Sequence, residues 1–337
     1  MELGAIWTVA ADGSGDYQFI QDAVNTVPDD NTERVTIHIK NGIYKEKLHI
    51  EKPLVSLVGE SAEHTIITYD DYALKTFPNG ELYHTFNSYS VFIGADDFQA
   101  ERISFINSAG RGSEVGQALA VYVEGDRVSF KQCRFLGYQD TVFTGPLPLQ
   151  PIDRSNFGGP QEGKPRRKLR QYYEDCYIEG DVDFIFGSAT ALFHRCEIFS
   201  KNRRVEADEI NGWVTAPSTP EDVPFGYVFL ACKLTGDAPP RSVYLGRPWR
   251  DHAKTAYLHC WLGDHIKPEG WHNWNKPQAE SSTAFVEYKN VGPGAVATER
   301  VSWSRQLNDQ EAELFNPANI LCGEDGWLPY DSTGSTK

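Results

Sequence analysis

The sequence predicts an all-β protein that folds as a solenoid, a parallel β-helix with short capping helices. One pattern recurs five times: an aromatic residue stands three positions before a cysteine, and an apolar residue stands two positions after it. The five copies are Phe130-Cys133-Phe135, Tyr173-Cys176-Ile178, Phe193-Cys196-Ile198, Phe229-Cys232-Leu234 and Tyr257-Cys260-Leu262. The cysteines are 43, 20, 36 and 28 residues apart. Such unequal intervals suit coils that share a core position while their loops vary in length.

Short β-rich runs predict the strands of these coils. Residues 35–39 (Val-Thr-Ile-His-Ile) and 55–58 (Val-Ser-Leu-Val) are two examples, and glycine and asparagine are placed at nearby corners. No long helical pattern separates consecutive strands, which favours a parallel β-helix over a βαβ sheet.

Helices are expected at the two ends of the solenoid, where the terminal coils would otherwise expose unpaired strand edges. Asp16, followed by the apolar residues within 19–27, predicts a short amphipathic helix with an aspartate N-cap. A second helix is predicted within 306–315. We expect one catalytic domain over 1–337, with a loop insertion at 144–170.

Composition limits the partners of the chain. Of its 337 residues 40% are hydrophobic, enough for a large core, and the formal charge of −15 disfavours nucleic acid or an anionic membrane as partner. No stretch approaches the roughly 18 apolar residues of a transmembrane helix. The first residues lack the features of a signal peptide, and the single methionine, Met1, fits an initiator in front of a processed, secreted chain. A cytoplasmic protein is the alternative, and we expect a monomer.

The five cysteines in one phase are expected to be buried free thiols. In stacked parallel coils their Cβ atoms would lie near the strand spacing of roughly 4.8 Å. This exceeds the Cβ separation of about 3.5–4.5 Å that a disulfide requires. Disulfide bonds are the alternative.

The insertion at 144–170 ends in a basic run, Lys164-Pro-Arg-Arg-Lys-Leu-Arg170. The run has two interpretations: a solvated surface, or a source of positive charge beside a cleft. The sequence contains no Gly-x-Ser-x-Gly elbow of a serine hydrolase, and no His-Glu-x-x-His or Cys-x-x-Cys motif that would support zinc.

A phrase of seven residues occurs twice and predicts a reactive site. Gly137-Tyr-Gln-Asp-Thr-Val-Phe143 and Gly180-Asp-Val-Asp-Phe-Ile-Phe186 share glycine, aspartate and phenylalanine at the same places, and each aspartate follows a cysteine by seven residues. In neighbouring coils, Asp140 and Asp183 would lie about one strand spacing apart. Two carboxylates that close cannot ionise independently, so one tends to keep its proton. A protonated acid beside a carboxylate suits acid/base or nucleophilic catalysis.

Six segments together resemble the pectin methylesterase (pectinesterase) family. In the order of that family they are Gly42-Ile-Tyr-Lys-Glu46, Gln117-Ala-Leu-Ala-Val121, Gly137-Tyr-Gln-Asp-Thr141, Val182-Asp-Phe-Ile-Phe-Gly187, Leu245-Gly-Arg-Pro-Trp249 and Glu287-Tyr-Lys-Asn-Val-Gly-Pro-Gly-Ala295. The resemblance implies a right-handed parallel β-helix and the removal of methyl esters from galacturonic acid residues of pectin or its oligomers. It implies no metal or organic cofactor.

The resemblance also implies catalytic roles. Asp183 would attack the ester carbonyl, and Arg247 would keep it oriented and ionised. Asp140 would protonate the departing methanol and then accept a proton from water. Gln117 and Gln139 would donate N–H groups to the oxyanion, each worth about 3 kcal/mol.

Aromatic and apolar residues would form the substrate-binding walls. These candidates are Trp249, Phe143, Phe186, Tyr138 and Val182. Three further tryptophans are weaker candidates for sugar platforms: Trp213, Trp271 and Trp274. Two other motif residues, Tyr44 and Glu46, are expected to be structural.

Structural alternatives exist for each catalytic residue. Asp140 and Asp183 could be corner aspartates that bond to the local backbone. Arg247 could belong to a structural ion pair, and Gln117 and Gln139 to a glutamine ladder. The chain also departs from the compact plant-type pattern, because a long insertion follows Phe143 and valine stands at 142, where leucine is common.

Other functions remain open from the residues alone. Two carboxylates about 5–5.5 Å apart would also suit a retaining glycoside hydrolase acting on a pectic backbone. Arginine and glutamine partners favour ester hydrolysis, because an oxyanion needs hydrogen-bond donors and an oxocarbenium ion does not. A lyase is disfavoured by the lack of a carboxylate-rich calcium site, and a non-catalytic carbohydrate-binding solenoid is the third alternative.

Overall fold

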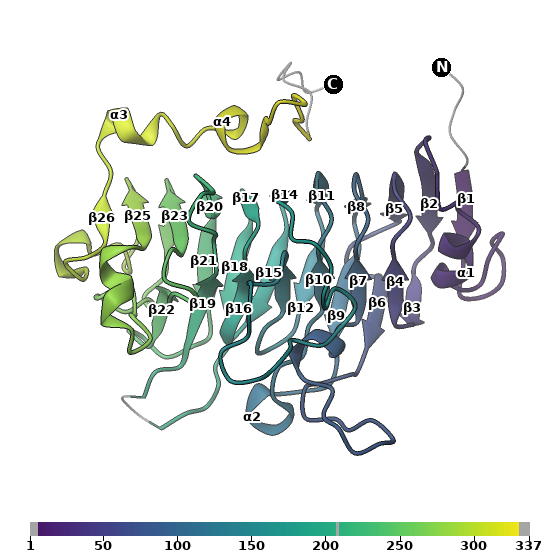
Figure 1. The fold of residues 1–337 in the computed structure, drawn as a ribbon, viewed down its shortest axis with the longest axis horizontal. Helices are drawn as coiled ribbons and strands as arrows, with labels where there is room; N and C mark the ends of the chain where they lie inside the picture. The colour runs from purple at the N-terminus through teal and green to yellow at the C-terminus, as the bar shows by residue number, and fades with distance from the viewer. Residues whose placement is uncertain (1–5, 207–208, 330–337) are drawn as a thin grey trace.

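A computed structural model describes residues 6–206 and 209–329. Three sheets run side by side along its length, and the strands within each sheet are paired in parallel, so the parallel β-helix is confirmed (Figure 1). Each full coil contributes one strand to each sheet. No helix in the described ranges is long and apolar enough to cross a membrane.

The longest sheet has eleven strands. In spatial order these are β1 (Ile6–Val9), β2 (Val35–Ile39), β5 (Val55–Gly59), β8 (Gln99–Glu101), β11 (Val128–Lys131), β14 (Arg170–Glu174), β17 (Thr190–His194), β20 (Tyr227–Leu230), β23 (Lys254–Leu258), β25 (Ala284–Tyr288) and β26 (Arg305–Gln306). The predicted strands at 35–39 and 55–58 are β2 and β5 of this sheet.

The other two sheets complete the coils. The eight-stranded sheet runs β24 (Trp261–Leu262), β21 (Lys233–Gly236), β18 (Glu197–Ser200), β15 (Tyr177–Gly180), β12 (Arg134–Leu136), β9 (Ser104–Asn107), β6 (Thr65–Tyr69) and β3 (Gly42–Lys45). The seven-stranded sheet runs β22 (Val243–Gly246), β19 (Gly212–Pro217), β16 (Val182–Gly187), β13 (Val142–Thr144), β10 (Val121–Val123), β7 (Val91–Ile93) and β4 (Leu48–Ile50).

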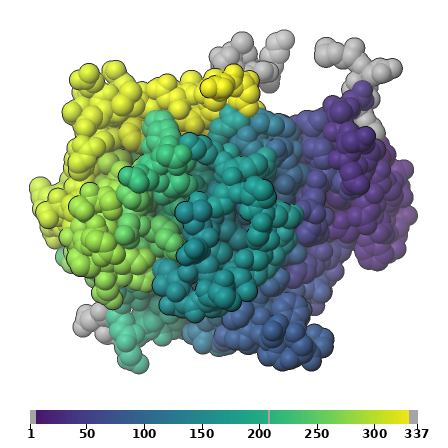
Figure 2. Space-filling view, viewed as in Figure 1, coloured from purple at the N-terminus to yellow at the C-terminus, as the bar shows by residue number. Residues whose placement is uncertain are grey.

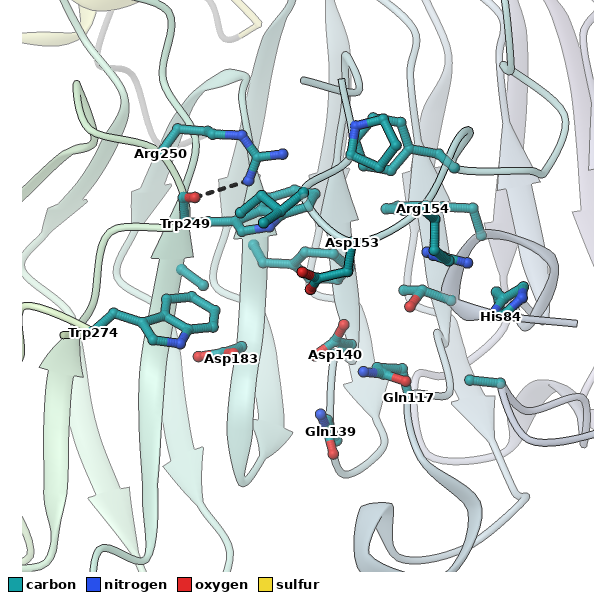
Figure 3. A pocket seen from close by; sticks show the side chains of 18 of the residues that line it. His84, Gln117, Gln139, Asp140, Asp153, Arg154, Asp183, Trp249, Arg250 and Trp274 are labelled. Atoms are coloured by element: carbon teal, nitrogen blue, oxygen red, sulfur yellow. Dashed lines mark hydrogen bonds between the residues drawn. The ribbon is translucent and has the colours of Figure 1, made fainter. Parts of the chain in front are cut away.

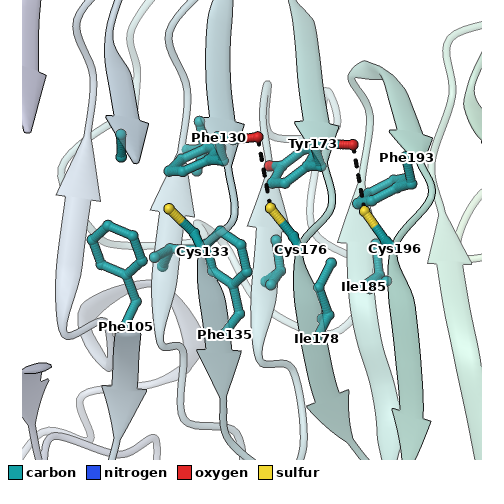
Figure 4. Packing of buried hydrophobic residues seen from close by; sticks show 14 of the residues in the cluster. Phe105, Phe130, Cys133, Phe135, Tyr173, Cys176, Ile178, Ile185, Phe193 and Cys196 are labelled. Atoms are coloured by element: carbon teal, nitrogen blue, oxygen red, sulfur yellow. Dashed lines mark hydrogen bonds between the residues drawn. The ribbon is translucent and has the colours of Figure 1, made fainter. Parts of the chain in front are cut away.

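The repeated aromatic–cysteine pattern forms a ladder inside the solenoid (Figure 4). The stacked rings are Phe130, Tyr173, Phe193, Phe229 and Tyr257, with successive centroids 5.0, 4.6, 4.6 and 4.5 Å apart and planes within 15° of parallel. The five cysteines below them are buried free thiols, as predicted, and the disulfide alternative is wrong. Four of these thiols donate to a carbonyl oxygen of the preceding coil at 3.2–3.6 Å.

The N-terminal cap is confirmed as a helix, but its predicted N-cap is wrong. Helix α1 (Ile20–Asn25) buries Ile20, Ala23 and Val24 against the first coil. Asp16 lies outside the helix and accepts a hydrogen bond from the Thr8 N–H at 2.8 Å. The Glu46 carboxylate takes the capping role, because its two oxygens accept the N–H groups of the first two helical residues at 2.9 and 3.0 Å.

The predicted C-terminal helix is confirmed in a shorter form. Helix α3 (Asp309–Ala312) begins after a capping box in which the Asn308 side chain accepts the Glu311 N–H. A second helix that the sequence analysis did not predict, α4 (Pro317–Leu321), packs on the outer face of the eleven-stranded sheet. The remaining short helices are α2 (Gly112–Val115), η1 (Thr85–Asn87), η2 (Pro277–Ser281) and η3 (Ala297–Glu299).

The insertion leaves the solenoid at the end of β13 and returns at the start of β14. Two of its buried apolar side chains, Leu147 and Phe157, join an aromatic cluster on the outside of the seven-stranded sheet. Four residues of its basic run are paired with acidic residues elsewhere in the chain: Lys164 with Glu51, Arg167 with Asp96, Lys168 with Asp222, and Arg170 with Asp126 and Asp325. The run therefore fastens the loop to the solenoid, and none of its residues lines the cleft described below. In Figure 2 this part of the chain is teal and lies on the visible face beside the green coils.

Candidate active site

The two repeated aspartates lie in neighbouring coils, as the duplicated phrase predicts. Strands β13 and β16 pair with Phe143 opposite Phe186, which places Asp140 level with Asp183. The backbone N–H of Asp140 donates to the carbonyl oxygen of Val182 at 3.0 Å. Both aspartates have left-handed backbone conformations, with φ of 61° and 49°. Residues other than glycine adopt this conformation at a cost, and such strain often marks functional positions.

Both carboxyl groups open into one cleft of about 700 Å³ (Figure 3). Coils of the seven-stranded sheet form its floor, and the insertion forms part of its wall. The lining residues on the floor include Gln117, Gln139, Asp140, Asp183 and Phe186. The cleft therefore brings together the aspartates and the amides that the sequence assigned to one site.

Arg247 holds one of the two aspartates and not the other. Its Nε and Nη2 atoms donate to the two carboxylate oxygens of Asp183 at 2.8 and 2.6 Å. The pair is shielded from water, because the Arg247 and Asp183 side chains are only 12% and 8% exposed. Two rings enclose the guanidinium: its Cζ atom lies 3.7 Å from the ring centroid of Trp213 and 3.7 Å from that of Trp274.

The different partners separate the protonation states of the two carboxyl groups. Burial raises the pKa of Asp140 well above its usual range, and the nearby Asp183 charge raises it further. Burial also raises the pKa of Asp183, but there Arg247 lowers it through both its charge and its hydrogen bonds, whereas at Asp140 only the charge of Arg247 acts. The ion pair with Arg247 therefore favours the ionised form of Asp183, whereas burial and the neighbouring carboxylate favour the protonated form of Asp140.

Two amide side chains stand free beside Asp140. Gln117 precedes β10 and Gln139 precedes β13, and the backbone of the two turns is joined by the Ala118 N–H donating to the Gln139 carbonyl at 3.2 Å. Both side chains are half-buried in the cleft (Figure 3). Within 6–206 and 209–329, neither side-chain amide makes a hydrogen bond with the protein, so both can donate to a bound molecule.

The predicted binding residues are divided between the cleft and the core. Phe186 and Trp249 line the cleft, with ring centroids 5.7 Å apart. Phe143 does not, because its ring is fully buried behind Phe186. Val182 is also buried, and the Tyr138 ring lies outside the cleft beneath the Lys201 ammonium, 3.6 Å from it.

The three weaker tryptophan candidates also differ in position. Trp274 lines the cleft, whereas Trp213 lies behind Arg247 and does not line it. Trp271 is buried in the core and stacks on Phe285 with centroids 4.4 Å apart. Tyr44 is buried with its hydroxyl donating to the Lys40 carbonyl, a structural role, as expected.

Comparison with known proteins shows the family of the chain. The model of the pectinesterase family matches residues 6–146 and 151–324. This chain belongs to the pectinesterase family.

Individual pectinesterases resemble it over nearly their whole length. Pectinesterase 31 of Arabidopsis thaliana is 39% identical, with 91% of this chain and 89% of that one aligned. The pectin methylesterase structure from carrot has 30% identity and a TM-score of 0.79, covering 97% of this chain and 96% of that one. A pectin methylesterase solved in complex with a hexasaccharide has 29% identity and a TM-score of 0.78, covering 98% of this chain and 99% of that one. The right-handed parallel β-helix expected from the sequence is thereby confirmed.

Several charged residues of this pectinesterase cleft were missed by sequence reasoning. Asp153 and Arg154 come from the insertion, where no periodic pattern indicates which side chains face inward. His84 comes from the turn before η1, and Lys276 from the loop before η2. Arg250 directly follows the matched segment 245–249, a signal that could have identified it.

The described part of the chain contains no cluster of side chains suited to hold a metal ion. Across 6–206 and 209–329, no three His, Cys, Asp or Glu side chains converge as metal ligands would. The residues that line the cleft include two buried aspartates, two glutamine amides and the guanidinium of Arg247.

Proposed function

We propose that Asp183 and Asp140 carry out the hydrolysis of galacturonate methyl esters in this member of the pectinesterase family. The family assignment makes the chain a carboxylic ester hydrolase that acts on pectin. The observation that carries the residue roles is the unequal pairing of the two aspartates: Asp183 is bonded through both oxygens to Arg247, and Asp140 has no cationic partner in hydrogen-bond contact within the described residues. One group is therefore ready as a nucleophile and the other as an acid.

The first half of the reaction forms an acyl-enzyme. An Asp183 oxygen attacks the ester carbonyl carbon, and the carbonyl oxygen becomes an oxyanion that accepts N–H groups from Gln117 and Gln139. As the tetrahedral centre collapses, the bond to the methoxy oxygen breaks and Asp140 gives that oxygen its proton. Methanol leaves, and Asp183 holds the galacturonyl group as a mixed anhydride.

The second half restores both carboxyl groups. Asp140, now a carboxylate, accepts a proton from a water molecule that attacks the galacturonyl carbon. The anhydride bond breaks, Asp183 leaves as a carboxylate beside Arg247, and the product is a galacturonic acid. Asp140 is again protonated, as the reaction requires at its start.

The walls of the cleft support a sugar polymer as substrate. Phe186 and Trp249 present apolar faces next to the catalytic pair, which suits the face of a sugar ring and the ester methyl group. The hexasaccharide bound to a related pectin methylesterase supports an oligogalacturonide chain in this cleft. Because such a polymer does not cross membranes, we also propose that the enzyme acts outside the cell. We further propose that it is a monomer.

The test measures methanol and new reducing ends from highly methylated pectin and from short methylated oligogalacturonides. We expect methanol without new reducing ends; reducing ends without methanol would instead indicate a glycoside hydrolase. Asp183→Asn should lower kcat by at least about 10⁴-fold and Asp140→Asn by about 10²–10⁴-fold, with the fold retained by circular dichroism.

Asp97→Asn is a matched control for both variants. Asp97 also has a left-handed backbone, with φ of 58°, and is bonded through both oxygens to an arginine, Arg127, at 2.8 Å. It does not line the cleft. Activity should survive in Asp97→Asn, and the proposal fails if Asp183→Asn turns over substrate as fast as this control does.

A further inference from the structure

We propose that Trp213 and Trp274 form a positioning pair that holds Arg247 against Asp183, and that His272 fixes Trp213 in place. The inference rests on the proposed role of Asp183 as the nucleophile. It assigns a function to two residues, Trp213 and His272, that do not line the cleft.

Three separate segments meet at the guanidinium. Trp213 belongs to β19, Arg247 directly follows β22, and Trp274 lies in the loop before η2. The Cζ atom of Arg247 is 3.7 Å from each ring centroid, so an aromatic ring covers the cation on two sides. Both contacts fall well within the range of cation–π interactions.

Backbone strain supports a specific purpose for Trp274. It has a left-handed conformation, with φ of 55°, and so does the following Asn275. A bulky aromatic residue in this region is a conformational outlier that persists only when surrounding contacts enforce it. The Lys276 ammonium supplies such contacts by donating to the carbonyl oxygens of Pro248 and Trp249 at 2.9 and 3.0 Å, which ties the turn to the segment that carries Arg247.

Trp213 is itself held by two neighbouring side chains, His272 and Tyr244. Its indole Nε1–H donates to Nδ1 of His272 at 3.3 Å, and its ring lies at 13° to that of Tyr244. Burial and the nearby Arg247 charge lower the pKa of His272, which keeps the imidazole neutral and its Nδ1 able to accept. The indole plane is therefore fixed by a partner that does not itself touch Asp183.

Aromatic faces suit this position because they attract a cation without competing for its N–H groups. An acceptor side chain in their place would draw the guanidinium away from Asp183, and water would weaken the ion pair by raising the local dielectric constant. With a ring on each side, the Nε and Nη2 donors remain directed at the Asp183 carboxylate. The tryptophan pair thus acts on Asp183 through Arg247.

The effect of the tryptophan pair on Asp183 should appear in the acidic limb of the pH–activity profile, the pH range over which activity is lost as the pH falls. The charged groups that face Asp183 are Arg247, Lys276 and Arg203, which lower its pKa, and Asp140 on the neighbouring coil. If Arg247 loses its fixed position, its opposition to the effect of burial weakens and the pKa of Asp183 rises. Activity, which needs ionised Asp183, should then disappear at a higher pH than in the wild type.

The experiment compares Trp213→Leu with Trp213→Phe in the methanol assay across pH. Leucine fills space without a π face, whereas phenylalanine retains one. We expect Trp213→Leu to lower kcat by about tenfold to 100-fold and to move the acidic limb upward by about one pH unit, while KM stays within about twofold. Trp213→Phe should recover most of the rate and the wild-type limb. Trp274→Leu should shift the limb in the same direction and also raise KM, because Trp274 lines the cleft.

Trp303→Leu is the control, because Trp303 is a partly buried core tryptophan outside the cleft. Its acidic limb should not move. The proposal is overturned if Trp213→Leu keeps the wild-type limb, or if leucine and phenylalanine reduce kcat equally. Should Trp213→Leu fail to fold, as judged by circular dichroism, the limb of Trp274→Leu decides. Failure of the proposed function is distinguishable, because then Asp183→Asn would itself remain active.

Discussion

The inside of the solenoid and its cleft use the same repeat in opposite ways. Inside, the five aromatic residues of the ladder have nearly identical surroundings from coil to coil, each stacked on the next. At the cleft, Asp140 and Asp183 also occupy equivalent positions of two coils, but among the described residues a cation forms an ion pair with Asp183 and none with Asp140. In the core, equivalent residues of neighbouring coils stack on one another, whereas the proposed chemistry depends on two equivalent aspartates that have different partners.

The difference at the cleft comes from residues outside the repeat. Arg247 enters from a later coil, Trp274 from a strained loop, and the cleft wall from the insertion. In the part of the chain that the structure describes, no cation is paired with Asp140 as Arg247 is with Asp183. The repeat therefore supplies the spacing of the two carboxyl groups, and in the proposed mechanism the residues outside the repeat determine which one is ionised.

The largest effect should come from removing Arg247, which pairs with one of the two aspartates and not with the other. Arg247→Leu would leave both aspartates buried without a paired cation, and we expect kcat to fall by about 10³-fold, with the acidic limb moved to higher pH. Arg247→Lys should recover part of the rate, since a lysine keeps the charge but cannot bond both oxygens in the same geometry. Methanol release measured from pH 4 to 10 checks both expectations.

Arg127→Leu is the matched control, because it breaks the equivalent bidentate pair with Asp97 away from the cleft. A 10³-fold loss in that variant as well would show that any such pair is needed for folding, and would contradict a special role for Arg247.

The next effect concerns the ladder and should appear in stability alone. Phe193 is fully buried, with its ring centroid 4.6 Å from those of both Tyr173 and Phe229. Phe193→Ala should lower the free energy of unfolding by about 3–5 kcal/mol, measured by denaturant titration. At a temperature where the variant remains folded, kcat should match the wild type. A loss of kcat in folded protein would mean that ladder and cleft are coupled.

The ladder was predictable from sequence because stacking makes each coil depend on the phase of its neighbours. The shared offset from a cysteine to Asp140 and to Asp183 predicted their pairing for the same reason. The position of Arg247 follows no such phase; it was assigned through the family motif in which it stands. Tryptophans 213 and 274 could not be placed at the guanidinium, because no local pattern indicates which loops converge in space.

Two other outcomes show where local patterns are insufficient. The basic run 164–170 was open to interpretation as a charge source for the cleft, and its partners, among them Asp96 and Glu51, are acidic residues far away in sequence. Phe143 shares its place in the repeat with Phe186, yet only Phe186 reaches the cleft, because other rings cover Phe143.

A smaller effect is expected in the pH dependence of stability, where variants of the two aspartates can be compared. Because burial raises the pKa of Asp140, the folded protein binds an extra proton there, and this contribution to stability decreases as pH rises above the unfolded value of about 3.9. Asp140→Asn cannot ionise, so it should be more stable than the wild type by about 1–3 kcal/mol at pH 7, with the difference vanishing near pH 4. Thermal unfolding at both pH values measures it.

Asp183→Asn should be less stable than Asp140→Asn at pH 7, because the substitution leaves the buried Arg247 guanidinium without its partner. An equal or larger gain from Asp183→Asn would contradict the asymmetry between the two sites.

The smallest expected effect concerns the N-terminus of helix α1. It compares Asp16, the N-cap predicted from the local sequence, with Glu46, which caps the helix in the structure. Glu46→Gln would remove the charge that accepts the first two N–H groups of α1, at a cost of about 1 kcal/mol in the free energy of unfolding. Asp16→Asn alters an exposed contact to Thr8 and should cost less than half as much. Denaturant titration of the two variants measures both losses in the free energy of unfolding. A larger loss from Asp16→Asn would mean that the helix is stabilised from its own sequence and not by the neighbouring coil. Catalysis should be unchanged in both variants, because neither residue lines the cleft.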